Sequence, residues 1–158
     1  MRNYKNPLVF IVEDNEAYAE MICYNVHKRD YSTEVFHSGE DCIRNLYKNP
    51  DVIILDYMLG SIDGLEVLKQ VKSINPDIQV IFLSGQEDLN VGINSLKYGA
   101  YDYVVKDEAS FDNVIITLNK ISKLNSILRE QLKKKKNISR AVTLALGITL
   151  IIVLLLKL

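Results

Sequence analysis

The chain has 158 residues, enough for one ordinary domain and an appendage, which argues against a second complete domain. Its 19 basic and 20 acidic side chains give a formal net charge of -1, which points to neither a nucleic-acid-binding protein nor a strongly acidic one. The charges are unevenly distributed. Residues 1–112 carry 10 basic and 19 acidic side chains, whereas residues 113–158 carry 9 and 1. An acidic part is therefore followed by a basic one.

Two cysteines are too few for a disulfide framework or a zinc site, and they indicate a reducing compartment. The first residues are polar, and only five apolar residues follow before Glu13, which does not resemble a signal peptide. We therefore expect the N-terminal part to stay in the cytoplasm.

Five short runs rich in β-branched residues predict five strands. They occupy residues 8–12, 33–36, 52–55, 78–83 and 101–105. Three of them are almost wholly apolar, as expected of central parallel strands that are covered on both faces. Pro7, Pro50 and Pro76 each precede one of these runs, where a missing N–H is tolerated.

Segments with helical spacing alternate with the strands. They cover residues 17–28, 39–48, 64–73 and 89–98, and one more begins at 111. Residues that favour helix caps stand ahead of four of them: Asp14 or Asn15, Ser38, Asp63 and Ser110. Strict alternation with short connections predicts an α/β fold with a doubly wound, five-stranded parallel sheet.

The last helix is predicted to continue beyond the compact domain, which we place at residues 6–125. A solvated stalk and a weak coiled-coil seam both fit the apolar stripe there. Residues 126–137 form a basic linker, whose Lys133–Lys136 run lacks the interleaved aromatics of a nucleic-acid-binding surface. Residues 141–156 carry no charge, so we predict a transmembrane tail anchor over 138–158, with the basic linker on the cytoplasmic side.

Polar residues follow four of the predicted strands, at the edge where function gathers in an open parallel sheet. Glu13 and Asp14 follow the first strand and Asp56 the third. Ser84 and Lys106 follow the fourth and fifth. Three carboxylates in one place repel one another, and a hard divalent cation such as Mg²⁺ relieves that repulsion through oxygen ligands.

Mg²⁺, an ammonium, a hydroxyl and a carboxylate together are suited to phosphoryl transfer. Asp56 is the predicted nucleophile, which forms an acyl phosphate. Lys106 and Ser84 are predicted to contact the phosphoryl oxygens. The set contains no dedicated general base, so the covalent state should be long-lived, as a signalling protein requires and a turnover enzyme does not. An aspartyl-phosphate hydrolase is disfavoured because Met58, two residues after Asp56, is not an acid.

Four motifs now resemble a known family, the receiver domain of two-component response regulators. They are Phe10-Ile11-Val12-Glu13-Asp14-Asn15, Ile53-Ile54-Leu55-Asp56 with Asp63-Gly64, Phe82-Leu83-Ser84-Gly85, and Gly99-Ala100-Tyr101-Asp102-Tyr103-Val104-Val105-Lys106. The resemblance covers roughly residues 6–125 and implies a flavodoxin-like fold.

The resemblance also implies a role for each matching residue. Asp56 would be the phosphoacceptor, and Glu13, Asp14 and the backbone carbonyl of Met58 would join it on Mg²⁺. Ser84 and Lys106 would bind the phosphoryl group, and Ser84 and Tyr103 would form the switch. The donor would be a phosphohistidine on a sensor histidine kinase or a phosphotransfer protein.

Two departures from the family pattern stand near the site. Gly60 replaces the usual proline four residues after the acceptor, which predicts a more mobile loop. Lys106-Asp107 replaces the usual Lys-Pro with its cis bond, so we expect a trans bond and a shifted loop. A purely structural role stays open for three residues: Asp14 as a helix cap, Ser84 as a turn residue and Tyr103 as an aromatic residue of a strand.

The predicted protein is a stand-alone receiver tethered to the cytoplasmic membrane by a single pass, with its domain facing the cytoplasm. It would act through contacts with an unidentified downstream protein, without nucleic acid, and a homodimer is left open. The alternative is a membrane-tethered docking module that keeps the receiver shape and works without phosphorylation.

Overall fold

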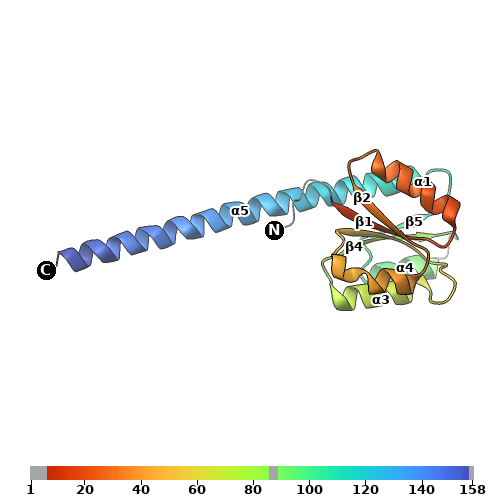
Figure 1. The fold of residues 1–158 in the computed structure, drawn as a ribbon, viewed down its shortest axis with the longest axis horizontal. Helices are drawn as coiled ribbons and strands as arrows, with labels where there is room; N and C mark the ends of the chain where they lie inside the picture. Colours follow the sequence, from red (N-terminus) through yellow and green to blue (C-terminus); the bar gives the residue numbers. More distant parts are fainter. Residues whose placement is uncertain (1–6, 86–88, 157–158) are drawn as a thin grey trace. The chain divides into compact units, whose positions relative to one another are not determined.

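The computed structural model describes residues 7–85 and 89–156, in which strands and helices alternate along the chain (Figure 1). In chain order they are β1 (Leu8–Val12), α1 (Glu16–His27), β2 (Ser32–Phe36), α2 (Gly39–Arg44), β3 (Val52–Asp56), α3 (Gly64–Ile74), β4 (Gln79–Ser84), α4 (Leu89–Lys97), β5 (Asp102–Val105) and α5 (Ser110–Leu155). The strands form one parallel sheet in the order β2-β1-β3-β4-β5. This confirms the predicted α/β fold and its doubly wound sheet.

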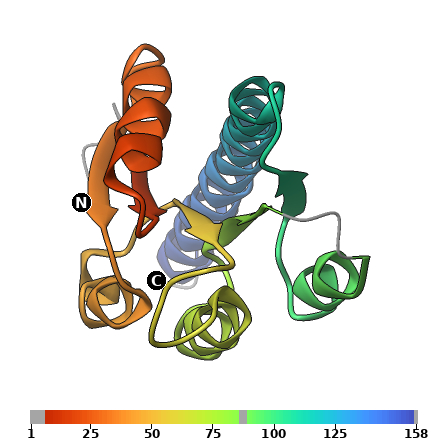
Figure 2. The ribbon, with the colours of Figure 1, turned by 90° about the vertical axis from the view of Figure 1, so that its right-hand side faces the viewer.

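The sheet lies between two layers of helices (Figure 2). Helix α1 and the beginning of α5 cover one face, and α2, α3 and α4 cover the other. Strand β3 is buried along its whole length, and β1 and β4 are buried except at their first residues. The three apolar runs are therefore the central strands, as predicted.

Helix capping follows the sequence at three of the four predicted positions. The side chains of Asn15, Ser38 and Asp63 accept hydrogen bonds from backbone N–H groups in the first turns of α1, α2 and α3. Asp14 is thus not the cap of α1 and remains available to the site. Ser110 is the first residue of α5 rather than a residue ahead of it.

The helix predicted over 39–48 is divided in two. Helix α2 ends at Arg44, and residues 46–48 form a 3-10 turn, η1 (Leu46–Lys48). Asn45 leaves the helical conformation, and its side-chain amide donates to the Asp41 carbonyl, which competes with the regular helix pattern. Asn49 then adopts a left-handed conformation, with φ 53°, that ends the turn.

Helix α5 continues to Leu155, so the predicted long last helix is confirmed. The chain divides into two compact units, residues 1–119 and 120–158, and the second consists largely of the rest of this helix. Within the described residues, no helix is both long and apolar enough to cross a membrane. The transmembrane helix predicted over 138–158 is therefore not found there, and residues 157 and 158 of that segment lie outside the described residues.

A glycine allows the first turn of α3 to lie directly against the end of β3. The Gly64 N–H donates to the Tyr57 carbonyl at 2.8 Å. A Cβ atom at Gly64 would lie 2.2 Å from the carbonyl oxygen of Asp56 and 2.9 Å from the Tyr57 Cα. These neighbours are backbone atoms that cannot rotate away, so only glycine fits this position.

We therefore expect Gly64→Ala to lower the free energy of unfolding by ~1–3 kcal/mol, because the added methyl group overpacks the end of β3. Urea denaturation followed by circular dichroism measures this loss. Gly85→Ala is the matched control, since a Cβ atom there has nothing within 4 Å. Equal stability of the two variants would contradict the proposed close approach.

Candidate functional site

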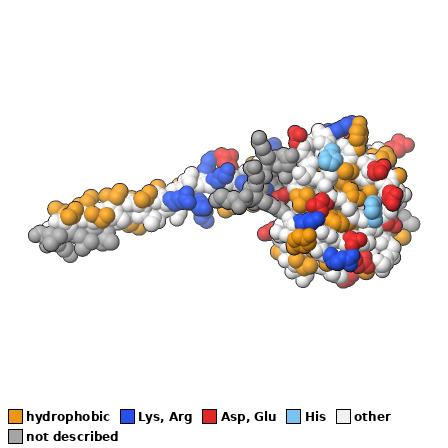
Figure 3. Space-filling view, viewed as in Figure 1, with side chains coloured by type: hydrophobic (Ala, Val, Ile, Leu, Met, Phe, Trp, Pro, Cys, Tyr) orange, Lys and Arg blue, Asp and Glu red, His pale blue; other side chains and the backbone are white. Residues whose placement is uncertain are grey.

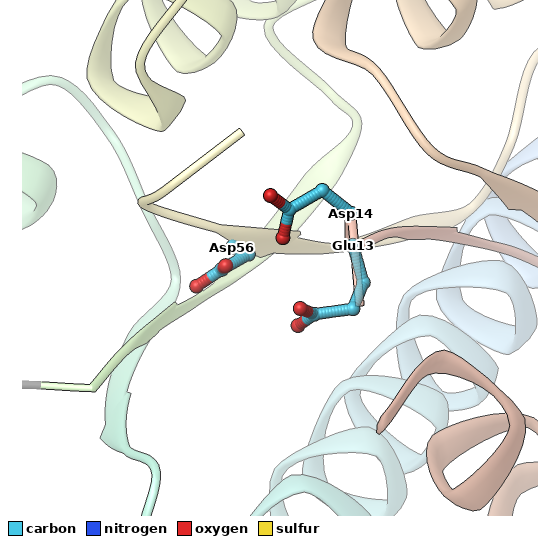
Figure 4. Close-up of side chains that lie close together, drawn as sticks. All are labelled: Glu13, Asp14 and Asp56. Carbon is cyan, nitrogen blue, oxygen red and sulfur yellow. The ribbon is translucent and has the colours of Figure 1, made fainter. Parts of the chain in front are cut away.

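Three carboxylates meet at the carboxyl ends of β1 and β3 (Figure 4). Glu13 and Asp14 follow β1, and Asp56 is the last residue of β3. One oxygen atom of each lies within 4.8 Å of one from each of the others. The two strands are parallel neighbours with Val12 opposite Leu55, so the sheet register itself brings these side chains together. Glu13 is 1 % exposed and Asp56 is 2 % exposed, whereas Asp14 is open to solvent.

Lys106 forms ion pairs with both buried carboxylates. Its Nζ lies 2.6 Å from Glu13 Oε2 and 3.0 Å from Asp56 Oδ2. The backbone N–H of Lys106 donates to the carbonyl of Ser84 at 2.8 Å, which fixes the start of this side chain beside the end of β4. The side chain therefore reaches the acidic cluster from the neighbouring edge of the same sheet.

The site shifts the pKa of Glu13, Asp56 and Lys106. Burial raises the pKa of Asp56 and of Glu13, and the Lys106 ammonium opposes both shifts without cancelling them. Repulsion from Asp56 raises the pKa of Glu13 further. Burial alone would lower the pKa of Lys106, but its hydrogen bonds to the two carboxylates outweigh burial and raise it. The positive charge of Lys106 is thus secured, while one carboxylate charge is left in excess.

Backbone groups hold the carboxylates in place. The Tyr57 N–H donates to Asp56 Oδ1 at 2.8 Å, so the two oxygens of Asp56 have different partners. The Asn15 N–H lies 3.3 Å from Glu13 Oε1. His37, which the sequence does not connect to the site, places its Nδ1 2.9 Å from the Glu13 carbonyl oxygen. These contacts fix the backbone next to the acidic pair.

The predicted switch residues lie on β4 and β5. Ser84 is buried at the end of β4, and in the sheet register it is opposite Val105, the residue before Lys106. Tyr103 is half-buried, and its ring stacks on that of Phe82 with centroids 6.5 Å apart. A Cβ atom at Gly92 of α4 would lie 3.3 Å from the Tyr103 ring, so the ring packs closely against that helix.

Both departures from the family pattern have a local structural reason. Gly60 has a φ of +78°, a conformation that proline, fixed near -65°, cannot adopt. After Lys106, the Asp107 side chain accepts from the Ala109 N–H at 2.9 Å, and its carbonyl accepts from the Ser110 N–H at 3.2 Å. All peptide bonds of the described residues are trans, as predicted for Lys106-Asp107, and Lys106 still reaches the carboxylates.

The donor set suits Mg²⁺. Three carboxylate oxygens close together, one of them from a solvent-exposed side chain, match a small hard cation that keeps part of its water shell. The excess negative charge beside Lys106 favours such a cation as well. Met58 lies in the loop after β3 with an exposed side chain; the predicted role of its backbone carbonyl stays a prediction.

A family model described as the response regulator receiver domain matches residues 9–117. The chain belongs to this family. The transcriptional regulatory protein TrcR of Mycobacterium tuberculosis is 32% identical over 99 residues, which cover 62% of this chain and 38% of TrcR. The regulatory protein LuxO of Vibrio cholerae is 25% identical over 126 residues, which cover 79% of this chain and 28% of LuxO. The chain thus spans well under half the length of these curated relatives.

Solved structures share the fold. The receiver domain of a Francisella response regulator is 31% identical with a TM-score of 0.69, and the match covers 76% of this chain and 99% of that one. A receiver domain protein from Clostridium thermocellum superposes with a TM-score of 0.71 at 23% identity, over 77% of this chain and 98% of that one. The receiver fold therefore accounts for about three quarters of the chain.

The polar residues predicted from the sequence to lie together do so in the structure, but two residues that contact them, His37 and Tyr18, were not predicted. Glu13, Asp14, Asp56 and Lys106 form a single cluster, and Ser84 lies beside it. Tyr18 of α1, which sequence reasoning did not single out, lies with its ring centroid 4.6 Å from Lys106 Nζ. Its position four residues after Asp14, within the first turn of α1, was the available signal.

We expect Asp56→Asn to raise the free energy of unfolding at pH 7 without divalent cations, because burial opposes ionisation of Asp56 in the folded state. The variant removes the excess charge and leaves Lys106 paired with Glu13. Because burial raises the pKa of Asp56 in the folded state, its contribution to stability is complete below its ordinary pKa of about 4. That contribution is lost as the pH rises through the raised folded pKa, so the advantage of the Asn variant should grow over this interval.

Urea denaturation between pH 4 and pH 8 in EDTA measures this difference. Glu20→Gln removes an exposed carboxylate of α1 and serves as the control. Added Mg²⁺ should reduce the difference in stability between Asp56→Asn and the wild type, because the cation would neutralise the wild-type cluster. If the difference in the free energy of unfolding between Asp56→Asn and the wild type does not depend on pH, ionisation of Asp56 does not destabilise this site.

Proposed function

We propose that the chain accepts a phosphoryl group on Asp56 from a histidine kinase or a phosphotransfer protein. One observation carries this proposal: the Lys106 ammonium lies 3.0 Å from one Asp56 oxygen, and the Tyr57 N–H holds the other, beside Glu13 and Asp14. Receiver domains as a family accept phosphoryl groups from such kinases, and the acidic cluster agrees with that role.

The chemistry follows from the positions of the groups. An Asp56 oxygen attacks the phosphorus of a phosphohistidine; the new P–O bond forms as the P–N bond breaks, and the leaving imidazole takes a proton from solvent. Lys106 and the Ser84 hydroxyl bind the oxygens of the transferred group. Glu13, Asp14 and Asp56 would hold Mg²⁺, which would neutralise part of the phosphoryl charge.

Slow loss of the phosphoryl group is part of the proposal. Glu13 is bound to Lys106, and Asp14 and Asp56 are proposed metal ligands, so these carboxylates are already engaged. A water molecule attacking the acyl phosphate would therefore receive little help from a general base. The chain would act as a phosphoacceptor with a long-lived modified state.

Phosphorylation would change the surface of the protein through movements of Ser84 and Tyr103. If phosphorylation draws Ser84 inward, the neighbouring Tyr103 ring must shift, and its close packing against Gly92 transmits that shift to α4. Output through contacts with another protein, without DNA binding, belongs to this proposal. A homodimer stays a prediction.

Intact-mass spectrometry of the full chain with acetyl phosphate tests the acceptor. With Mg²⁺ we expect a gain of about 80 Da, the mass of one phosphoryl group, which is lost with EDTA and in Asp56→Asn. Asp63→Asn is the matched control, because Asp63 caps α3 outside the cluster and the variant should still be modified. A modified Asp56→Asn protein would show that another residue is the acceptor.

The same experiment decides the alternative function. If a control receiver gains mass and this chain does not, the site is not a phosphoacceptor. The chain would then be a docking module that keeps the receiver fold, and its effect on a partner would not depend on the donor.

We also propose that residues 138–158 attach the chain to the cytoplasmic membrane, with the receiver domain on the cytoplasmic side. Two features of α5 support this. Figure 3 shows apolar side chains along its C-terminal part and a group of basic ones before them. Large apolar side chains there are at least half exposed: Val142, Leu144, Leu146, Ile148, Ile151, Ile152, Leu155 and Leu156. Lys133–Lys136 would contact anionic lipid headgroups.

Sedimentation with vesicles that contain anionic lipid tests the attachment. We expect the full chain to sediment and a variant that ends at residue 137 to stay in the supernatant. A variant with Lys133–Lys136 changed to Gln separates the two contributions, since lost headgroup contacts weaken binding by about tenfold or more. Sedimentation of the truncated variant at the level of the full chain would contradict attachment through residues 138–158.

A further inference from the structure

Tyr18 connects α1 to the active-site lysine and to the start of α5. Its ring centroid lies 4.6 Å from Lys106 Nζ, a distance at which a ring face attracts an ammonium. Its hydroxyl lies 2.9 Å from Ser110 Oγ, and Ser110 is completely buried. Its ring also packs against that of Phe111, with centroids 5.1 Å apart. The half-buried ring is therefore held on one edge and presents a face to Lys106.

Lys106 needs such a contact because its side chain has four rotatable bonds, and its ammonium is a compact charge without a preferred direction. In the structure Glu13 and Asp56 hold the ammonium. Once Asp56 carries a phosphoryl group, its oxygens are no longer those of a free carboxylate, so one of these partners changes. The face of the Tyr18 ring does not change in that step.

The residues after Lys106 also connect Tyr18 to the turn that carries this lysine. The Ser110 that bonds Tyr18 also donates its backbone N–H to the Asp107 carbonyl. Lys106, Asp107, Ser110 and Tyr18 thus form a closed set of contacts around the turn that leads from β5 into α5. The ring that faces the ammonium is tied to the same turn that carries Lys106.

We propose that Tyr18 is a positioning residue: its ring face holds the Lys106 ammonium where it meets the phosphoryl group on Asp56. This inference rests on the proposed phosphoryl transfer. Tyr18 touches neither the donor nor the reacting atoms, and it acts through Lys106. The ring is the active part, and the hydroxyl orients it through Ser110.

The test uses the full chain with Mg²⁺ and acetyl phosphate, and it measures the rate of mass gain. Tyr18→Leu removes the ring and should slow phosphorylation by about threefold to tenfold, the range of a partly buried cation–π contact. Tyr18→Phe keeps the ring and should restore most of the wild-type rate. Tyr24→Leu is the matched control, because Tyr24 lies on the same helix and also faces a lysine, with Lys28 Nζ 4.0 Å from its ring.

A second measurement reads the contact itself. A ring face shifts the NMR signals of protons above it upfield, so the Lys106 Cε protons should be shifted in the wild type and in Tyr18→Phe. The shift should be lost in Tyr18→Leu and kept in Tyr24→Leu. In a Lys106→Met background, Tyr18→Leu should have no further effect on the rate, because the group that it positions is gone.

Each contrary result is distinct. A wild-type rate for Tyr18→Leu overturns the positioning role and leaves the proposed function intact, whereas a wild type that gains no mass removes the proposed function itself. Equal slowing by Tyr18→Phe and Tyr18→Leu would show that only the bond to Ser110 matters. Full slowing by Tyr18→Leu in the Lys106→Met background would show an effect that does not pass through Lys106. If Lys106→Met is too slow to measure, loss or persistence of the upfield shift decides.

Discussion

The ion pairs of Lys106 with Glu13 and Asp56 are the interaction on which this end of the molecule depends. A parallel sheet in the order β2-β1-β3-β4-β5 places the carboxyl ends of its strands at one edge, so the chain cannot keep acids after β1 and β3 apart. Both carboxylates are buried, and burial without a cation would favour their protonated forms. One lysine at the end of β5 makes two ionised carboxylates tolerable in the same small volume.

Lys106 balances only part of the negative charge at the site, and the remaining charge determines which groups the site favours. One ammonium faces two buried carboxylates and the exposed Asp14, so negative charge is left over and the pKa values of Glu13 and Asp56 stay raised. A site in this condition favours groups that bring positive charge or hydrogen-bond donors. The charge repulsion within the site and the suitability of its carboxylates for a divalent cation therefore have the same physical origin.

Much of this arrangement could be predicted from sequence because it depends on local pattern. Apolar runs predicted the strands, their alternation with helices predicted a parallel sheet, and the polar residues that follow four of the strands predicted the cluster around Asp56. Contacts across elements could not be predicted in this way. The Tyr18 ring meets Lys106 only because α1 and the start of α5 cover the same face, and His37 reaches the Glu13 carbonyl across a loop. The transmembrane helix predicted over 138–158 is not found among the described residues.

At the two departures from the family pattern, other local interactions set the backbone where the family usually has proline. Proline sets a backbone by restricting φ, whereas Asp107 sets it by accepting hydrogen bonds from the next turn at its side chain and its carbonyl. Hydrogen bonds restrict the backbone less firmly than a proline ring does. Contacts from another element therefore help to hold the turn that carries Lys106. Tyr18 of α1 makes such contacts: its hydroxyl bonds Ser110, and its ring faces Lys106. The hydrogen bonds of Asp107 and the contacts of Tyr18 therefore act on the same turn, which carries the Lys106 ammonium to the acidic cluster.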